Sequence, residues 1–388
     1  MNVPHPPDPI PGAAALFSLD PDLSHLNHGS LGAVPYPVQH ARRLLLDEAE
    51  HDPRAFAERV PSRLRLAREA VTPLVSARAD LTAFVPNATT GVALILHSLG
   101  LSDGDEIVTT DHGYPSIDFN VASQVRYRGA VHRRVEISLT PTDDEVVEAI
   151  MAAVTPRTRL VVLDHITSAT ARIFPVERVA AALREGNVPL LVDAAHVPGH
   201  LPVNVSTIGA DFWVGNVHKW AYAPRGTALV SISPSWRDRM RPLVESYGHD
   251  QGFPGSVEYH GTDGYTGWIA APVGPAVLDQ LGTTRVQQHN AALAAYGQAV
   301  VARALDVELP DAGVSSPLAM RLVPLPDGVV HHGEDAHALW RRIRDELFCE
   351  VAVTSWNGRG LLRVAANVYN RPGEYERLAE TLAKLLYG

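Results

Sequence analysis

The sequence predicts an α/β fold, with a large domain built on a mostly parallel seven-stranded sheet flanked by helices and a smaller α+β domain after it. Two observations lead to this prediction. In the middle of the chain, short apolar runs alternate with stretches of helical periodicity, which is typical of parallel strands covered on both faces. After about residue 283, longer helical stretches replace this alternation. A chain of 388 residues is long enough for two such units.

Seven apolar runs are predicted to be the strands of the large sheet. They are LTAFVPN (81–87), DEIVTTD (105–111), VHRRVEI (131–137), RLVVLDHI (159–166), PLLVDAAH (189–196), ADFWVGNVHKW (210–220) and GTALVSI (226–232). Helical periodicity predicts helices between several of them, at 88–99, 142–154 and 176–185.

The change of pattern near residue 283 divides the chain into three predicted segments. These are an N-terminal arm and helix at 1–60, a large domain at 61–282 and a small domain at 283–388. The small domain is predicted to contain a helix at 285–305, the strand MRLVPLP, a helix at 334–347, the strands CEVAVT and GLLRVAA, and a last helix at 372–386.

Composition excludes several classes of protein. A net charge of −10 gives no reason to expect a nucleic-acid partner. The single cysteine, Cys349, excludes a disulfide within the chain and a Cys-rich zinc site, and it favours a reducing compartment. The sequence shows no membrane-length apolar stretch and no signal-peptide pattern at its start, so we expect a cytoplasmic protein without a membrane partner.

Polar residues follow five of the predicted strands. They lie at 87–90, 111–114, 164–170, 193–196 and at Lys219. Ligands of open α/β sheets collect at the carboxyl ends of the strands, so these positions predict a binding site.

Lys219 is one of only two lysines among 33 basic residues. An amine that must lose its proton and attack a carbonyl cannot be a guanidinium, which stays protonated. The other lysine, Lys384, is predicted to be a solvated residue of the amphipathic last helix.

Asp193 and the segment 88–90 indicate what the lysine serves. Asp193 follows an apolar strand, where its buried charge needs a cation such as a protonated ring nitrogen; the alternative is that it caps a turn. Ala88, Thr89 and Thr90 begin an apolar helix, whose free N–H groups suit a phosphate; the alternative is ordinary capping by Asn87 or Thr89. No dinucleotide-binding or P-loop glycine motif is present.

A phosphate, a basic ring nitrogen and an aldehyde beside a lysine occur together in pyridoxal 5′-phosphate. The pair VDAAHVPG and GNVHKW, with segments from LNHGSLGAVP (26–35) to LLRVAANVYNRPGEYERL (361–378), resembles the class V aminotransferase family. This family has fold type I of the pyridoxal-phosphate enzymes, and the resemblance is strongest to its isopenicillin N epimerase-like branch.

The resemblance implies roles for individual residues. Lys219 corresponds to the lysine that binds the cofactor aldehyde, Asp193 to the partner of the ring nitrogen and His196 to a contact of the ring 3-oxygen. Tyr114 corresponds to the aromatic residue that stacks on the ring. Further cofactor contacts are implied for Ala88, Thr89, Thr90, Ser168, Asn216 and His218, and for Thr262 of a neighbouring subunit in a homodimer.

The substrate side of the site is implied in the same way. Arg363 corresponds to the arginine that binds the substrate α-carboxylate, and Asn27 and His28 to the N-terminal segment that lines the substrate pocket. The substrate is therefore expected to be a small molecule of the amino-acid class, and no metal is expected. The sequences HVPGH (196–200) and HLNH (25–28) have possible metal-ligand spacing but lack an acidic companion.

Three reactions remain open for an amino acid that forms a carbanion at Cα. The first is cleavage of an S-substituted L-cysteine, by C–S elimination or by deamination coupled to decarboxylation. The second is epimerisation, with His28 or Tyr114 as the acid opposite Lys219. The third, cysteine desulfuration, needs a mobile thiol, whereas Cys349 is predicted to face the buried side of a strand.

Two departures from the resemblance bear on these alternatives. Ser168 replaces the asparagine of the desulfurases, as it does in the epimerase-like branch, and Asp263 and Gly264 replace the arginine and aspartate often found in epimerase-like members. A strict isopenicillin N epimerase is therefore disfavoured. A non-catalytic protein with this fold would be expected to have lost Lys219 or Asp193, and both are present.

Overall fold

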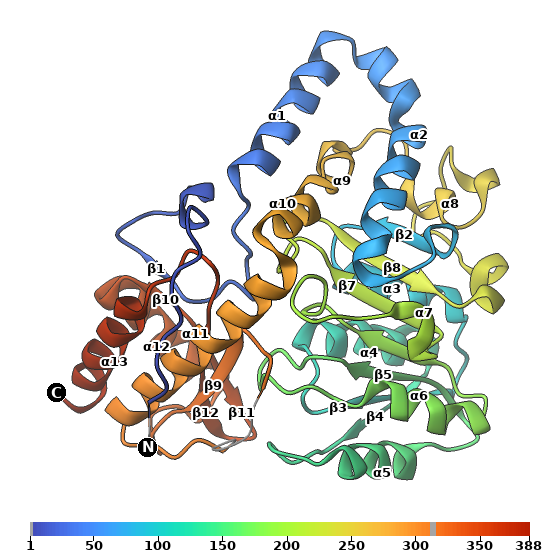
Figure 1. Cartoon of the computed structure of the whole chain (residues 1–388). Helices are drawn as coiled ribbons and strands as arrows, with labels where there is room; N and C mark the ends of the chain where they lie inside the picture. The colour runs from blue at the N-terminus through green and yellow to red at the C-terminus, as the bar shows by residue number, and fades with distance from the viewer. Residues whose placement is uncertain (1–2, 311–315) are drawn as a thin grey trace. The chain divides into compact units, whose positions relative to one another are not determined.

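The computed structural model describes residues 3–310 and 316–388 (Figure 1). The chain divides into two compact units. The larger consists of residues 37–168 and 172–276, and the smaller of residues 1–36, 169–171 and 277–388. These boundaries differ from those of the three segments expected from the sequence. The division into three segments stays a prediction. Residues 1–2 of the expected N-terminal arm and residues 311–315 of the expected small domain lie outside the described residues.

The larger unit contains the seven-stranded sheet, which confirms the predicted fold class. Its strands lie in the order β2-β8-β7-β6-β5-β3-β4. The strands β3 to β7 are mutually parallel, while β8 runs antiparallel to both β7 and β2. Their bounds are β2 (Thr82–Val85), β3 (Glu106–Thr110), β4 (Val131–Val135), β5 (Thr158–Asp164), β6 (Leu190–Asp193), β7 (Phe212–Asn216) and β8 (Ala228–Ile232).

Helices cover both faces of this sheet (Figure 1). The helices α3 (Ala88–Leu99) and α4 (Pro115–Arg128) pack against each other over one face, and α5 (Asp143–Ala153) and α6 (Val176–Glu185) pack over the other. This arrangement follows from the right-handed crossovers between parallel strands. The remaining helices are α1 (Tyr36–His51), α2 (Pro53–Val71), α7 (Val205–Ile208), α8 (Gly255–Glu258), α9 (Thr266–Ile269) and α10 (Val273–Leu281).

The helix α3 begins and ends where its sequence predicts. The side chain of Asn87 accepts a hydrogen bond from the backbone N–H of Thr90 and caps the first turn, and Gly100 ends the helix in a left-handed conformation. Gly91 allows the helix to lie close to the sheet, because a Cβ there would come within 2.8 Å of Val214 Cγ1. The first turn of α3 is therefore held beside the end of β7.

The helix α4 was not among the helices predicted between the strands. Only Ile117 and Val121 of its 14 residues are buried, so the segment lacks the apolar stripe by which a helix is usually found in a sequence. Pro115 occupies its first turn, where a missing N–H costs nothing, and Gly129 ends it in a left-handed conformation.

The smaller unit is an α+β assembly. Its three-stranded antiparallel sheet has the order β11-β12-β9. The bounds are β9 (Met320–Pro324), β11 (Ala352–Trp356) and β12 (Arg359–Ala365), with α11 (Thr283–Ala304), α12 (Gly333–Leu347) and α13 (Pro372–Tyr387) packed on it and on one another.

The segment 349–354, predicted to be one strand, is two strands that meet different partners. Residues of β10 (Cys349–Glu350) pair in parallel with β1 (Ser24–His25), and the chain then passes to β11, which pairs with β12. The partner strand β1 comes from the other end of the chain, so local sequence could not reveal the break. Cys349 is buried as predicted, with 2% of its surface exposed.

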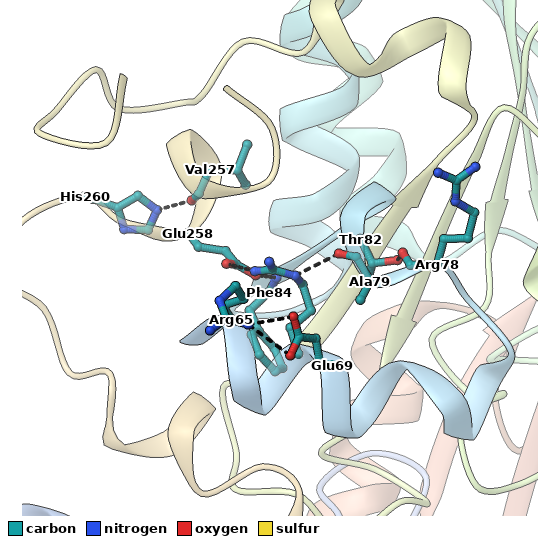
Figure 2. Close-up of polar contacts among 10 residues, drawn as sticks. Arg65, Glu69, Arg78, Ala79, Thr82, Phe84, Val257, Glu258 and His260 are labelled. Carbon is teal, nitrogen blue, oxygen red and sulfur yellow. Dashed lines mark hydrogen bonds and ion pairs between the residues drawn. The ribbon is translucent and has the colours of Figure 1, made fainter. Parts of the chain in front are cut away.

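A buried ion pair ties α2, β2 and α8 together in the larger unit (Figure 2). Arg68 of α2 contacts the carboxylate of Glu258 and donates a hydrogen bond from its Nε to the carbonyl oxygen of Ala79 at 2.8 Å. The other carboxylate oxygen of Glu258 accepts the backbone N–H of Phe84, in the edge strand β2, at 2.8 Å. Burial raises the pKa of Glu258, and Arg68 opposes this effect. The Arg68 cation therefore offsets part of the cost of burying this carboxylate.

No helix in the described ranges 3–310 and 316–388 has the length and apolar character needed to cross a membrane.

Replacing Arg68 by Met should lower the free energy of unfolding by about 3–5 kcal/mol, because it leaves the buried Glu258 carboxylate without its cation. Adding Glu258→Gln should recover part of this loss, since the amide keeps an acceptor for Phe84. Urea unfolding measures both effects. The matched control is Arg65→Met, which breaks the exposed pair with Glu69 and should cost less than about 1 kcal/mol. Equal losses in the two single variants would contradict the importance of the buried pair.

Candidate active site

The carboxyl edge of the large sheet gathers most of the predicted site residues. Asp164 ends β5, Asp193 ends β6 and Asn216 ends β7, and Lys219 follows β7 in a turn. The parallel direction of these strands brings their last residues to one edge. In the same unit, the first turn of α3 lies beside Asn216, whose Oδ1 accepts the backbone N–H of Ala88 at 2.9 Å.

Asp193 is a buried carboxylate with 3% of its surface exposed. Its Oδ1 accepts the backbone N–H of Ala195 at 3.0 Å. Burial raises the pKa of Asp193, while the Ala195 hydrogen bond and the charge of Lys219 act in the opposite direction. The carboxylate thus lies within the electrostatic reach of the Lys219 amine.

Lys219 is half-buried and its Nζ lies 3.2 Å from Nε2 of His196. The turns that carry these two residues are packed together. The rings of His200 and Trp220 stack with centroids 4.2 Å apart, and Gly199 lies so close to the backbone of Trp220 that a Cβ would be 2.5 Å from its carbonyl oxygen. This close packing fixes Lys219 beside His196.

The start of α3 combines the two features expected from its sequence, which are a capping residue and polar groups that suit a phosphate. Asn87 is the capping residue, so capping is real. Thr89 does not cap the helix: its Oγ1 lies 2.9 Å from Oγ of Ser116 at the start of α4. Thr90 donates from its hydroxyl to Asn87. The Thr89–Ser116 contact therefore brings the first turns of two helices together, and the start of a helix suits an anion.

His218 lies between β7 and Lys219 and is neutral at physiological pH. Burial, with the charges of Lys219 and Arg225, lowers the pKa of His218 to about 4 despite a hydrogen bond that opposes the shift. Its Nδ1 lies 2.8 Å from the carbonyl oxygen of Thr227. The ring is therefore held in place, and any contact that it makes with an anion is a neutral hydrogen bond rather than an ion pair.

Three other predicted residues occupy loops of the larger unit. Tyr114 immediately precedes α4, makes no capping hydrogen bond with its side chain, and is about half exposed. Ser168 lies in the loop after β5 and is partly buried. Thr262 is exposed in the loop 259–265, whose fold is held by Tyr265: its hydroxyl donates to the carbonyl oxygen of Gly261 at 2.9 Å and accepts the backbone N–H of His260.

A second group of predicted residues forms a polar cluster in the smaller unit. Arg363 of β12 is buried, and its guanidinium donates to Oδ1 of Asn27 at 3.1 Å and to Oγ of Ser30 at 3.0 Å. His28 is fully buried, with Nδ1 2.9 Å from the hydroxyl of Tyr369. The N-terminal segment and β12 are thus joined by side-chain hydrogen bonds across 336 positions of sequence.

Three residues at these two clusters had no predicted role: Asp164, Ser116 and Ser30. Asp164 did carry a signal, because an apolar strand ends in aspartate there just as it does at Asp193. Ser116 and Ser30 carried none. Serine is frequent in turns, and these contacts arise only from packing.

Metal binding receives no support from the described part of the chain. Among residues 3–310 and 316–388, no three or more His, Cys, Asp or Glu side chains are grouped so that they could hold an ion.

Comparisons with known proteins agree with the fold. The family model for class V aminotransferases matches residues 50–323. The isopenicillin N epimerase of Amycolatopsis lactamdurans is 31% identical and covers 95% of this chain and 96% of its own length. A putative L-cysteine desulfhydrase of Oryza sativa subsp. japonica is 27% identical and covers 94% of this chain and 83% of its own.

A solved structure shares the fold. The complex between the cystine C-S lyase C-DES and its product cysteine persulfide has a TM-score of 0.79 at 19% identity, and it covers 94% of this chain and 98% of that one. The molecule therefore has fold type I of the pyridoxal-phosphate enzymes. The chain belongs to the class V aminotransferase family and is a pyridoxal-phosphate-dependent enzyme.

Replacing Lys219 by Ala should abolish the absorbance band near the visible edge that the purified protein shows with pyridoxal phosphate, because the amine that bonds the aldehyde is lost. The matched control is Lys384→Ala, which removes the only other lysine, an exposed residue paired with Glu380. An unchanged spectrum of the Lys219 variant, or loss of the band in the control, would contradict the role of Lys219.

The cofactor-free protein should lose stability as the pH falls from 6.5 towards 4, partly because His218 takes up a proton in the unfolded chain that it refuses in the folded one. Stability rises with pH wherever the unfolded state binds more protons. His218→Asn should therefore reduce the slope of unfolding free energy against pH in this window by up to about 1.4 kcal/mol per pH unit. Urea unfolding at several pH values tests this. Exposed His40→Asn should leave the slope unchanged, and equal slopes for wild type and His218→Asn would count against a neutral His218.

Proposed function

We propose that the residues at the carboxyl edge of the large sheet bind pyridoxal phosphate. The chemistry of the donors supports this proposal. Asp193 is a buried carboxylate that suits a protonated ring nitrogen, and the Lys219 amine lies within its electrostatic reach. The hydroxyls of Thr89 and Thr90 lie at the start of α3, beside Asn216, and suit a phosphate. The neutral His218, two residues after Asn216, is a further candidate for this contact.

The remaining cofactor contacts rest on the family resemblance. Tyr114 would stack on the ring, His196 would contact its 3-oxygen, and Ser168 and Ala88 would complete the cradle. His196 also lies 3.2 Å from the Lys219 amine, so it would help to orient that amine. The bound cofactor supplies one chemical function, which is to withdraw electrons from the Cα of an attached amino acid.

The protein's own residues would then control the proton at Cα. In this proposal Nζ of Lys219 takes that proton as the general base. Asp193 stabilises the positive charge of the cofactor ring and so favours electron withdrawal. Arg363 would bind the α-carboxylate of the substrate as a planar, permanently charged donor, supported by Asn27 and Ser30, which already fix its guanidinium.

The reaction that we favour is cleavage of the C–S bond of an S-substituted L-cysteine. Lys219 removes the Cα proton, the Cβ–S bond breaks, and the sulfur leaves with a proton as a thiol. With one water the remaining atoms give pyruvate and ammonia. Relatives named L-cysteine desulfhydrase support this class of reaction. Decarboxylation coupled to deamination is a less favoured reaction. An arginine bound to the α-carboxylate stabilises the substrate before carbon dioxide is lost, which raises the barrier to that loss.

Epimerisation is the second candidate, because a relative that covers 95% of the chain is an isopenicillin N epimerase. Inversion needs an acid on the face of Cα opposite Lys219. The candidates are Tyr114 and His28, but His28 is fully buried and its Nδ1 lies 2.9 Å from the Tyr369 hydroxyl. Elimination needs only the single base Lys219, which is why we place it first.

Cysteine desulfuration is disfavoured by the state of Cys349. This thiol is 2% exposed in the core of the smaller unit, and burial raises its pKa well above the usual range of a cysteine. A buried neutral thiol cannot take sulfur from a substrate.

We also propose a homodimer in which Thr262 contacts the phosphate of the partner's cofactor. Its exposure in the middle of the loop 259–265 supports this, since a residue that serves another subunit must be on the surface. Light scattering of the purified protein measures the mass, and a monomer would exclude this sharing.

The reaction is tested by incubating the enzyme with S-substituted cysteines and with chiral amino acids in heavy water, followed by mass spectrometry. We expect release of thiol, pyruvate and ammonia from an S-substituted L-cysteine. Inversion with deuterium at Cα, and no thiol, would favour epimerisation instead. Cys349→Ala should keep the cleavage rate within about threefold of wild type, because the buried thiol takes no part. Loss of activity in a folded Cys349→Ala protein would restore desulfuration as the candidate.

A further inference from the structure

A second buried carboxyl group lies next to Asp193 and has no place in the reaction described above. Asp164, the last residue of β5, is 5% exposed, and it is the direct neighbour of Asp193 in the register of the parallel strands. Neighbouring strands are about 4.8 Å apart, so the two residues start from closely spaced backbone positions.

Both side chains lie on the same face of the sheet. Leu160 and Val162 of β5 and Leu191 of β6 belong to the core beneath α3 and α4. Side chains alternate between the faces of a strand, so Asp164 and Asp193 follow these residues onto that face. Oδ2 of Asp164 also lies beneath the turn that carries Tyr114, 3.7 Å from the point where a Cβ on Gly113 would be.

Two buried carboxyl groups at this spacing do not both ionise, because like charges repel strongly where water is excluded. The surroundings decide which one keeps its proton. Asp193 accepts the N–H of Ala195 and has Lys219 to lower its pKa. Asp193 and, more weakly, Asp118 of α4 raise the pKa of Asp164, while a backbone hydrogen bond opposes them and Lys219 has the smallest effect. Its pKa is raised well above the usual range by burial and by Asp193.

We propose that Asp164 is a positioning residue that stays protonated at neutral pH, so that Asp193 carries the single negative charge of this pocket. One anion then faces one ring cation of the bound cofactor. A second anion at Asp164 would compete with the ring nitrogen for a proton. The proton would then be bound less selectively at the ring. The neutral carboxyl fills the space beside Asp193 without competing for its charge.

This inference rests on the proposed role of Asp193 towards the ring nitrogen, but not on the reaction that the enzyme performs. Its test therefore reads the protonation state of Asp164 directly. Infrared difference spectra separate a protonated carboxyl, whose C=O band shifts in heavy water, from a carboxylate. They can be recorded for the cofactor-free protein and for the protein with pyridoxal phosphate.

At pH 7 we expect the spectrum of wild type minus Asp164→Asn to contain the band of a protonated carboxyl, both without and with pyridoxal phosphate. The control difference, wild type minus Glu380→Gln, should contain carboxylate and amide bands but no band of a protonated carboxyl, because Glu380 is exposed and paired with Lys384. Carboxylate bands in the Asp164 difference would overturn the proposal. So would a protonated band in the cofactor-loaded protein that disappears in Asp193→Asn instead.

Cofactor affinity gives a second readout, measured by fluorescence titration of the cofactor-free protein with pyridoxal phosphate. Asp164→Asn keeps a neutral group of the same shape. The dissociation constant of pyridoxal phosphate should therefore stay within about threefold of the wild-type value, a change in free energy equal to that of half a pKa unit. Asp193→Asn should weaken binding by more than about tenfold. Equal, large losses in both variants would mean that Asp164 is an anion, which overturns the proposal.

A folding defect in Asp164→Asn would be seen by circular dichroism, and Asp164→Ser, with a smaller neutral side chain, then supplies the infrared difference. Should the wild-type protein fail to bind pyridoxal phosphate, the proposed cofactor contacts fail, while the spectra of the cofactor-free protein still decide the state of Asp164.

Discussion

The constraint on which the site depends is the burial of a negative charge at the end of β6. A carboxylate with 3% exposure is costly unless a cation or hydrogen bonds compensate for it. The Ala195 N–H and the Lys219 charge supply part of this compensation, and a protonated cofactor ring supplies the rest in our proposal. The same demand explains why the adjacent carboxyl of Asp164 must stay neutral, since a second buried anion would have no partner of its own.

The fold meets this constraint by using the ends of several strands at once. The end of β7 contributes Asn216, which binds the first N–H of α3, and the following turn contributes His218 and Lys219. The first turns of α3 and α4 are joined by the Thr89–Ser116 contact. Each group is held by a different element, and the rigid sheet keeps their spacing constant. The buried Arg68–Glu258 pair also fixes elements to the sheet. At the edge strand β2 it joins α2 and the segment before Thr262 to that strand.

Each compact unit holds one group of the residues that we propose for the site. The larger one contains the lysine, the aspartate and the helix starts that suit a phosphate. The smaller one contains Arg363 and the N-terminal residues that hold its guanidinium. The choice among reactions depends on what surrounds Cα rather than on this shared machinery. The burial of Cys349 disfavours desulfuration. Epimerisation differs from C–S cleavage because it needs a second acid in addition to Lys219.

Much of this molecule could be predicted from its sequence. Near-continuous apolar runs marked the inner strands of the large sheet, because strands buried on both faces have little freedom to be polar. The edge strand β4 is the exception, since its sequence VHRRV is largely polar and none of its residues is buried. The rarity of lysine singled out Lys219, and the aspartate after an apolar strand singled out Asp193. The helix α4 was missed because its residues bury only two apolar side chains.

Tertiary structure alone decided the rest. The break between β10 and β11 depends on pairing with β1, more than 300 positions away, and no local pattern encodes such a partner. The neighbourhood of Asp164 and Asp193 is likewise a matter of strand order. Sequence showed two strands that each end in aspartate, but only the register of β5 against β6 brought the two carboxyls side by side and made their charges interdependent.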